Sequence, residues 1–276
     1  MEKLIFIDTN IFLDFYRIRG APASLKFLNK IEDNLDNIII TNQIQMEYLK
    51  NRQEVILGCL KDIKSDVKGL SVPSILQNSQ PFKVYSKNSK EANKQLTKLK
   101  ERINKIFINP SYNDPVFKVM NRIFKRQYDL HLDMSNEEKY KIRKLALKRF
   151  GMGYPPRKKG DNSIGDAINW EWMIHCCKEK SSDLIIVTRD NDFGKEIENK
   201  LYINDWLLKE FKERNSNRKN ISITKSLSHA FEEIQNPVSD QMKKEETKHI
   251  ESRKVILNPI EEARDLRAAI FRNFYK

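Results

Sequence analysis

Four acidic residues lie where an apolar run of the sequence ends or where a helix is expected to begin. They are Asp8, Glu47, Asp166 and Asp190. Each one alone is explained equally well by helix capping, because carboxylates stabilise helix N-termini. Four carboxylates brought together would repel one another unless a cation neutralised them, and Mg²⁺ and Mn²⁺ prefer such hard oxygen ligands. A metal site of this kind activates a water molecule and stabilises the charge that develops on a phosphate.

Small polar residues flank two of these carboxylates and are expected to orient them or to contact the substrate. Two of them follow Asp8 directly, and one precedes Asp190 by two positions. A further carboxylate lies two positions after Asp190 and is interpreted as an auxiliary group. These predicted auxiliary residues are Thr9, Asn10, Thr188 and Asp192.

The third metal ligand has two candidates in the stretch GDNSIGDAINW, Asp161 and Asp166. Ser163 can cap the helix that follows, which places Asp166 in the first helical turn. We favour Asp166 for this reason, and Asp161 then becomes an auxiliary residue or faces the substrate. Asp14 lies one turn into the first expected helix and is interpreted as a surface or capping residue, not as a ligand.

Four short apolar runs predict the strands that place these carboxylates. The three longest runs do not alternate polar with apolar residues, as is typical of strands covered by helices on both faces. Helical patterns separate the runs, so the sequence predicts a three-layer α/β fold with a central parallel sheet of four to five strands. The carboxyl ends of parallel strands share one edge, so the four carboxylates are expected to face one crevice. The runs are 4–8, 37–41, 183–188 and 221–224, with 201–204 as a short fifth strand.

A basic segment with helical periodicity separates the second and third runs. Residues 83–160 contain 21 Lys and Arg against 7 Asp and Glu, a balance of +14, which leaves −1 for the rest of a chain whose total is +13. Such a confined excess favours a polyanionic partner over a merely solvated surface, and nucleic acid over a membrane. The residues expected to contact nucleic acid are Lys118, Arg122, Lys125, Arg126, Arg157, Lys158 and Lys159.

The same shift in composition divides the chain into four expected parts. Two halves of one α/β domain enclose a linker and a basic helical insertion, in which Asp114-Pro115 is typical of a helix start. A charged helical tail follows the second half. The expected boundaries are 1–66, 67–160, 161–240 and 241–276.

Several other classes of protein are disfavoured. No apolar run approaches the roughly 18 residues that span a membrane, and no signal peptide is recognisable, so a cytoplasmic, reducing location is expected. The three cysteines and four histidines lack the spacing of a zinc site, and there is no P-loop motif. A haloacid-dehalogenase-type phosphatase needs a second Asp two positions after the first, and this chain has Asn10 there.

Taken together, these motifs resemble the PIN-domain nucleases. The resemblance rests on Asp8-Thr9-Asn10, on Glu47 early in the helix after the second strand, on Asp166 at a helix start, and on Thr188-Arg189-Asp190. It covers about residues 1–60 and 160–235, and it is closest to PIN-like domains that carry a helical insertion and a tail such as LYINDWLLKEF. Each motif alone is weak, whereas the combination is specific.

The resemblance implies a Mg²⁺- or Mn²⁺-dependent endoribonuclease that hydrolyses RNA at Asp8, Glu47, Asp166 and Asp190. Members of this kind include toxins, defence nucleases and RNA-processing enzymes, so a protein partner such as an antitoxin is one expectation and a membrane partner is not. One alternative is a DNA or flap-type nuclease that uses the same site. The other is a non-catalytic nucleic-acid-binding protein, which would have no reason to gather carboxylates beside a basic surface.

Overall fold

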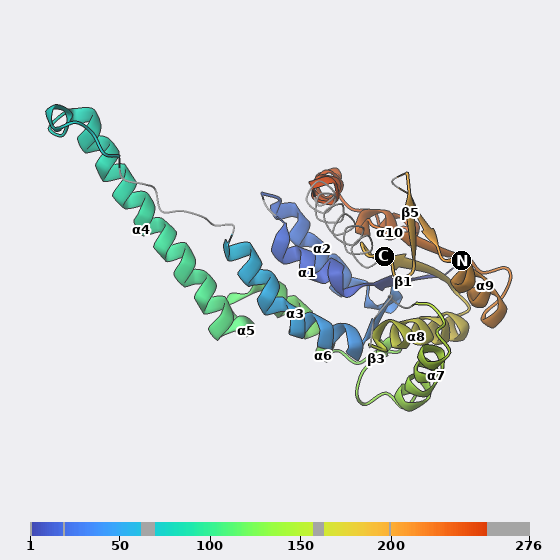
Figure 1. Cartoon of the computed structure of the whole chain (residues 1–276). Helices are drawn as coiled ribbons and strands as arrows, with labels where there is room; N and C mark the ends of the chain where they lie inside the picture. Colours follow the sequence, from blue (N-terminus) through green and yellow to red (C-terminus); the bar gives the residue numbers. More distant parts are fainter. Residues whose placement is uncertain (1, 19, 62–69, 157–162, 199, 253–276) are drawn as a thin grey trace, which may run out of the picture.

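A five-stranded parallel sheet forms the centre of the molecule in this computed structural model, which describes residues 2–18, 20–61, 70–156, 163–198 and 200–252 (Figure 1). The strand order is β3-β2-β1-β4-β7, and every neighbouring pair is parallel. The predicted α/β fold with a central parallel sheet is thereby confirmed. The strands are β1 (Lys3–Ile7), β2 (Ile38–Thr41), β3 (His131–Leu132), β4 (Asp183–Val187) and β7 (Ile221–Thr224).

The central strands are buried almost throughout, which explains why their sequences do not alternate. Leu4 to Ile7 of β1 and all of β4 are buried. Helices lie on both sides of the sheet, with α10 on one side and α7 and α8 on the other (Figure 1). β1 and β4 pair in register from Lys3 opposite Asp183 to Ile7 opposite Val187, so the two strands end together. This shared end brings residue 8 beside residue 188.

The fifth strand of the sheet differs from the one expected. The run 201–204 belongs instead to a separate antiparallel hairpin of β5 (Gly194–Ile197) and β6 (Lys200–Ile203). The fifth strand of the sheet is the edge strand β3, which pairs His131 and Leu132 with the end of β2. Two residues are too few to give a recognisable apolar run, so the sequence could not indicate this strand.

Helices connect the strands, and most of them bury one apolar face against the sheet or against each other. α1 packs on α3, α8 packs on β2 and β4, and α10 packs on β4 and β7. Short 3₁₀ turns η1 (Pro22–Leu25), η2 (Leu35–Asn37) and η3 (Ser74–Leu76) complete the connections. The helices of the body are α1 (Thr9–Arg17), α2 (Lys26–Asp33), α3 (Asn42–Lys61), α6 (Pro115–Lys125), α7 (Lys139–Gly151), α8 (Gly165–Lys180), α9 (Asp205–Arg214) and α10 (Leu227–Glu233).

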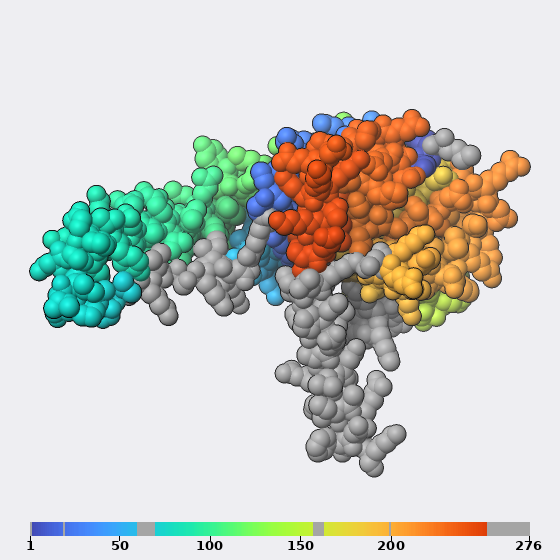
Figure 2. All heavy atoms as spheres, turned by 90° about the horizontal axis from the view of Figure 1, so that it is seen from above, coloured from blue at the N-terminus to red at the C-terminus, as the bar shows by residue number. Residues whose placement is uncertain are grey.

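One helix stands apart from the body. α4 (Gln80–Ile108) projects away from the sheet and is joined to it through the short helix α5 (Pro110–Asn113) (Figures 1 and 2). None of its 29 residues is buried. We call α4 and α5 the arm.

The expected insertion of 67–160 is therefore too long. After the arm the chain returns to the core, because α6 buries five apolar residues and α7 buries Ile142 and Ala146. These helices and β3 are integral parts of the α/β body. The Lys- and Arg-rich composition of the whole segment had hidden this boundary, since most cations of α6 and α7 are not buried, Arg149 being the exception.

A buried ion pair joins the arm to the body. The carboxylate of Asp114 accepts hydrogen bonds from Arg52 Nη2 at 2.6 Å and Arg52 Nε at 3.0 Å, and from the hydroxyl of Tyr16 at 2.7 Å. It also caps α6 by accepting from the backbone N–H of Phe117, as the Asp-Pro sequence predicts. Both charged partners are about 95% buried or more. The base of the arm is thus fixed to α1 and α3.

The described part of the C-terminal tail is helical from 240 to 252 and packs on the body. Val238 and Met242 join the hydrophobic core. The remainder of the tail expected to be helical, from 253 onward, lies outside the described residues. Among the residues that the structure describes, no helix is long and apolar enough to cross a membrane.

Candidate active site

Asp8 lies at the end of β1, where two neighbours hold its carboxylate. Its Oδ2 accepts hydrogen bonds from Thr188 Oγ1 at 2.6 Å and from Asn10 Nδ2 at 2.7 Å. The backbone N–H of Asp8 donates to Val187 O at 2.9 Å, which extends the β1–β4 pairing to this residue. The side chain is therefore fixed in place by residues from both strand ends, with one oxygen bonded and Oδ1 receiving no donor from the described residues.

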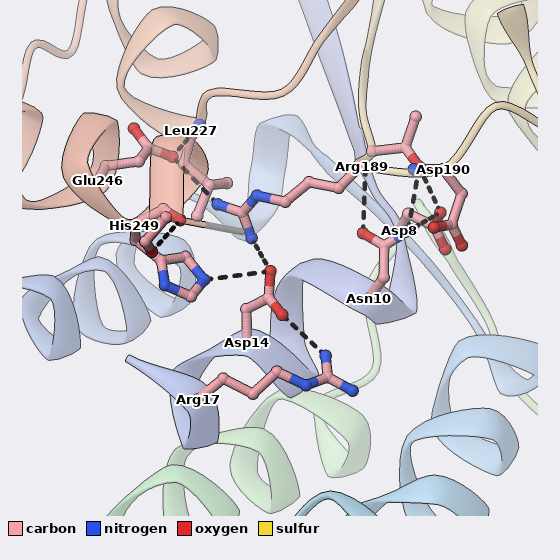
Figure 3. A network of polar contacts seen from close by, with 11 residues as sticks. Asp8, Asn10, Asp14, Arg17, Arg189, Asp190, Leu227, Glu246 and His249 are labelled. Carbon is pink, nitrogen blue, oxygen red and sulfur yellow. Dashed lines mark hydrogen bonds and ion pairs between the residues drawn. The ribbon is translucent and has the colours of Figure 1, made fainter. Parts of the chain in front are cut away.

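Asp190 is tied to the same group through Thr188 and Asn10. Its backbone N–H donates to Thr188 Oγ1 at 3.1 Å, and the preceding N–H, of Arg189, donates to Asn10 Oδ1 at 3.2 Å. Asn10 Nδ2 also reaches Thr188 Oγ1 at 3.1 Å. Thr188 and Asn10 thus connect the two strand ends, and the turn that carries Asp190 cannot move independently of Asp8 (Figure 3).

Glu47 is placed by different residues. Its Oε2 accepts from Thr9 Oγ1 at 2.9 Å, and its Oε1 accepts from Gln43 Nε2 at 2.7 Å. Thr9 was expected to orient Asp8; it bonds Glu47 instead. Gln43 was not anticipated, although its position one helical turn before Glu47 on α3 is the spacing at which side chains on a helix meet.

Gly165 brings the start of α8 against Glu47. A Cβ atom at this position would lie 2.8 Å from Glu47 Oε1 and 2.4 Å from Gln43 Nε2, so a larger residue would displace these two side-chain ends. Asp166 follows directly, in the first turn of α8, as expected. The hydroxyl of Ser163 accepts from the N–H of Gly165 at 3.2 Å, at the start of α8. Asp161 lies outside the described residues.

The carboxylates are close enough to perturb one another. The pKa of Asp8 is raised to about 7, mainly by burial and also by the negative charges of Asp190, Glu47 and Asp192, while the hydrogen bond from Thr188 opposes the rise. Asp192, expected to be auxiliary, therefore belongs to the charges that surround Asp8. Gly165, directly before Asp166, lies against Glu47 and brings the first turn of α8 to the site.

The donor set has the chemistry of a divalent-cation site. A carboxyl group whose ionisation is opposed by burial and by three other carboxylates is relieved when a cation binds. Within the described residues, however, no three acidic, His or Cys side chains are grouped tightly enough to hold a metal ion as they stand. Both oxygens of Glu47 and Oδ2 of Asp8 are engaged by neutral donors, so these side chains would have to turn toward an ion.

A second polar network lies directly behind the site (Figure 3). The guanidinium of Arg189 bonds Asp14 and lies 3.8 Å from Glu246. Asp14 also accepts from Arg17 at 2.8 Å and faces His249 Nε2 at 3.5 Å. Asp14 was expected at the surface or as a cap, but it is 1% exposed and serves as the buried counter-ion of Arg189. The residue between Thr188 and Asp190 is thereby anchored to α1 and to the C-terminal helix.

Glu246 anchors that helix to the body. Its carboxylate accepts from the backbone N–H groups of Leu227 at 2.6 Å and Ser228 at 2.9 Å, at the start of α10. Ser226 and Ser228 donate their hydroxyls to the same carboxylate. No local pattern indicated this role, because a Glu within a charged tail looks like a solvated residue.

The basic residues predicted to contact nucleic acid are placed differently from one another. Lys118 is exposed, with its ammonium 5.3 Å from the ring centre of Tyr112 in the arm. Arg122 makes a two-fold ion pair with Glu32 of α2, at 2.6 Å for each bond, and Arg126 acts on the same carboxylate. Lys125 is exposed. Arg157, Lys158 and Lys159 lie outside the described residues.

Comparison with known proteins agrees with the resemblance. The family model described as a PIN domain matches residues 5–193, which is more than half of the chain and includes the arm. No curated protein and no solved structure gives a significant match to the chain. PIN domains are generally nucleases that use divalent metals and act on nucleic acids. The strand order, the carboxylates at the strand ends and the matched family model together show that this chain belongs to the PIN-domain family.

Proposed function

We propose that the protein is a metal-dependent endoribonuclease whose active site is formed by Asp8, Glu47, Asp166 and Asp190. The observation that carries the proposal is the environment of Asp8. Three carboxylates act on a half-buried fourth, and a fold gains nothing from such repulsion unless a cation joins the group. Mg²⁺ or Mn²⁺ is the cation that suits an all-oxygen ligand set.

In this proposal Asp8, Glu47, Asp166 and Asp190 would hold one or two ions. The bound metal supplies a Lewis acid for the phosphate and lowers the pKa of a water molecule. Thr188 and Asn10 keep Asp8 in position, and Thr9 and Gln43 do the same for Glu47. These neutral donors hold the carboxylates near one another before substrate arrives, and the side chains of Asp8 and Glu47 would turn from these positions toward the ion.

The raised pKa of Asp8 gives the site a further property. Near neutral pH the metal-free carboxyl group is partly protonated, so it neither repels its neighbours fully nor binds a cation fully. Ionisation of Asp8 and loading of the site are therefore coupled, as is usual for carboxylate ligands. We expect RNA cleavage to rise as the pH passes through this range from below.

The substrate class rests on charge. The arm carries eight Lys and Arg against two Asp and Glu over residues 80–108, which suits RNA, with DNA as the alternative on the same catalytic groups. A role as a toxin, defence or RNA-processing nuclease fits this chemistry equally. A non-catalytic binding protein would leave the carboxylate cluster without a purpose, and the cleavage assay separates the two.

The test is cleavage of labelled single-stranded RNA, structured RNA and DNA by purified protein with Mg²⁺, Mn²⁺ or EDTA. We expect cleavage only with a divalent ion, and a loss of at least about a hundredfold in Asp8→Asn, because a lost Lewis-acid ligand removes several kcal/mol of stabilisation. Asp133→Asn is a matched control, since that partly exposed carboxylate accepts bonds from Ser135 and Asn136 of its own turn. Equal cleavage by Asp8→Asn and the parent would refute the site.

A further inference from the structure

The arm and the start of α6 enclose an open groove with a distinct chemistry. Its volume is about 860 Å³. We call it the arm groove and define it by the residues that the argument uses. These are Lys98, Glu101, Arg102, Lys105, Tyr112 and Lys118.

The cations of the arm groove form a regular row. Lys98, Arg102 and Lys105 are four and three residues apart, so they lie on one face of α4 at about 5–6 Å intervals. Lys118 faces them from α6. Within the described residues none of these four cations is paired with a carboxylate, and Glu101 is the one acid among the lining residues. Four positive charges against one negative charge make this groove an anion-binding surface.

An exposed aromatic ring lies among these charges. Tyr112 is 76% exposed, and its ring is contacted by the ammonium of Lys118 at 5.3 Å. Nucleic-acid-binding grooves combine cations that follow the phosphate backbone with aromatic rings on which bases stack. An acidic protein partner would pair with the cations, but it has no bases that could stack on the exposed ring between them.

Burial of side chains does not explain the position of the arm. Helices in globular proteins usually gain their stability by burying an apolar face, and α4 buries no residue. A buried ion pair nevertheless fixes its base to the body through Asp114 and Arg52. A helix that is held firmly at its base while burying none of its residues is available for a ligand.

We infer that the arm groove is a binding site for single-stranded RNA, distinct from the carboxylate site, in which Lys98, Arg102, Lys105 and Lys118 contact phosphates and Tyr112 stacks on a base. The inference rests on the proposed function only for the choice of RNA as ligand. It moves the predicted contact surface from the outer face of α6, where Arg122 is already neutralised by Glu32, to the space between α6 and α4.

The experiment measures binding of a fluorescent oligouridylate to the full-length protein in EDTA across a salt series. In EDTA no metal-dependent cleavage occurs, so failure here is distinguishable from failure of the nuclease proposal. The test variant replaces Lys98, Arg102 and Lys105 together by Gln. The matched control replaces Lys26, Lys244 and Lys248 by Gln, because these three exposed cations lie away from the arm groove and their loss changes the net charge equally.

Loss of three phosphate contacts should lower the salt slope by about 2, since each contact on a single strand contributes about 0.7. That corresponds to about a hundredfold weaker binding at 0.1 M salt when the two proteins bind alike at 1 M. The control should keep the parental slope. An unchanged slope in the test variant, or an equal loss in the control, would overturn the inference.

Single substitutions at two positions distinguish a loss of RNA contacts from a loss of folding. Glu101→Gln should bind oligouridylate more tightly than the parent, because it removes the one repulsive charge, and a damaged protein would not gain affinity. Tyr112→Ala should weaken binding about tenfold by loss of stacking, whereas Tyr112→Phe should not. Polyglutamate serves as the competitor that represents an acidic protein. If Tyr112→Ala weakened polyglutamate binding as much as RNA binding, the groove would be a general polyanion site and the assignment to RNA would fall.

Discussion

The carboxylate cluster around Asp8 and the cations of the arm groove are charged sites of opposite sign in opposite kinds of structure. The cluster lies at the ends of two buried strands, where Thr188 and Asn10 fix the carboxylate of Asp8, and Thr9 and Gln43 fix that of Glu47, through short hydrogen bonds. The groove lies on a helix that buries nothing, and its cations are exposed. Like charges are held close together only where the core enforces it, whereas the arm spreads its charges along a helix face.

This difference reflects what each site would have to do. Placing a metal ion for phosphate chemistry requires carboxylates held to a fraction of an ångström, and rigid strand ends provide that. Attracting a flexible polyanion requires charge but little precision, and an exposed helix provides that with screened, independent contacts. Rigidity and exposure are therefore divided between two parts of one chain, with Asp114 and Arg52 as the joint between them.

The largest expected effect breaks the joint. Asp114→Ala leaves Arg52 buried without its counter-ion and removes the cap of α6, so we expect a loss of about 3–5 kcal/mol in the free energy of unfolding. Urea denaturation followed by circular dichroism measures it. Asp114→Asn keeps the cap acceptor but not the charge, and should lose less. A loss below about 1 kcal/mol in the Ala variant would show that the arm is not anchored through this pair.

The next effect concerns the repulsion in the cluster. The pKa of Asp8 is about 7 in the folded protein and 3.8 as its ordinary value, so between these limits the unfolded chain releases a proton that the folded chain keeps. Stability contributed by this group therefore falls as pH rises from about 4 to 7, by as much as about 4 kcal/mol. In EDTA, Asp8→Asn should be as stable as the parent near pH 4 and more stable at pH 8. Equal dependence of unfolding free energy on pH in Asp8→Asn and the parent would contradict the repulsion proposed around Asp8.

A smaller effect tests the support behind the cluster. Glu246→Gln places an amide where the carboxylate accepts from Leu227 and Ser228 and lies 3.8 Å from Arg189, and should cost about 1.5–3 kcal/mol of stability. It should also lower RNA cleavage while oligouridylate binding stays unchanged, because Arg189 lies between Thr188 and Asp190. Glu245→Gln is the matched control on the same helix, since Glu245 bonds Ser24 and has no contact with Arg189. An equal loss of cleavage in both variants would mean that Glu246 stabilises the fold in general and does not position Arg189.

The smallest effect sharpens the boundary of the arm groove. Arg122 pairs with Glu32 at the surface, so Arg122→Gln should change stability by less than about 1 kcal/mol. It should also leave RNA affinity nearly unchanged, whereas Lys118→Gln, one turn earlier on α6, should weaken it. The two variants remove the same charge from one helix. Affinities that fall equally would mean that the whole outer face of α6 binds RNA.

The PIN-domain resemblance and the central sheet could be predicted from local sequence patterns, which do not depend on contacts with distant residues. The buried runs that end at Asp8 and Asp190 predict parallel strands because their burial leaves no alternation, and the acidic residues at their ends stand out against that apolar background. Asp114 before Pro115 predicted a helix cap for the same local reason. These features could be predicted because each depends on residues that are neighbours in the sequence.

Only the tertiary structure decided the contacts between residues far apart in the chain. β3 is a strand because the end of β2 offers it a partner, and Gly165 matters because α3 passes close to it. Glu246 and Asp14 become buried counter-ions of Arg189 across separations that no local pattern encodes. The sequence by itself determined which residues could carry charge and where strands end. The packing of the chain decided which of those charges are held together in the core and which remain exposed on the arm, because burial and pairing depend on neighbours that the linear order does not specify.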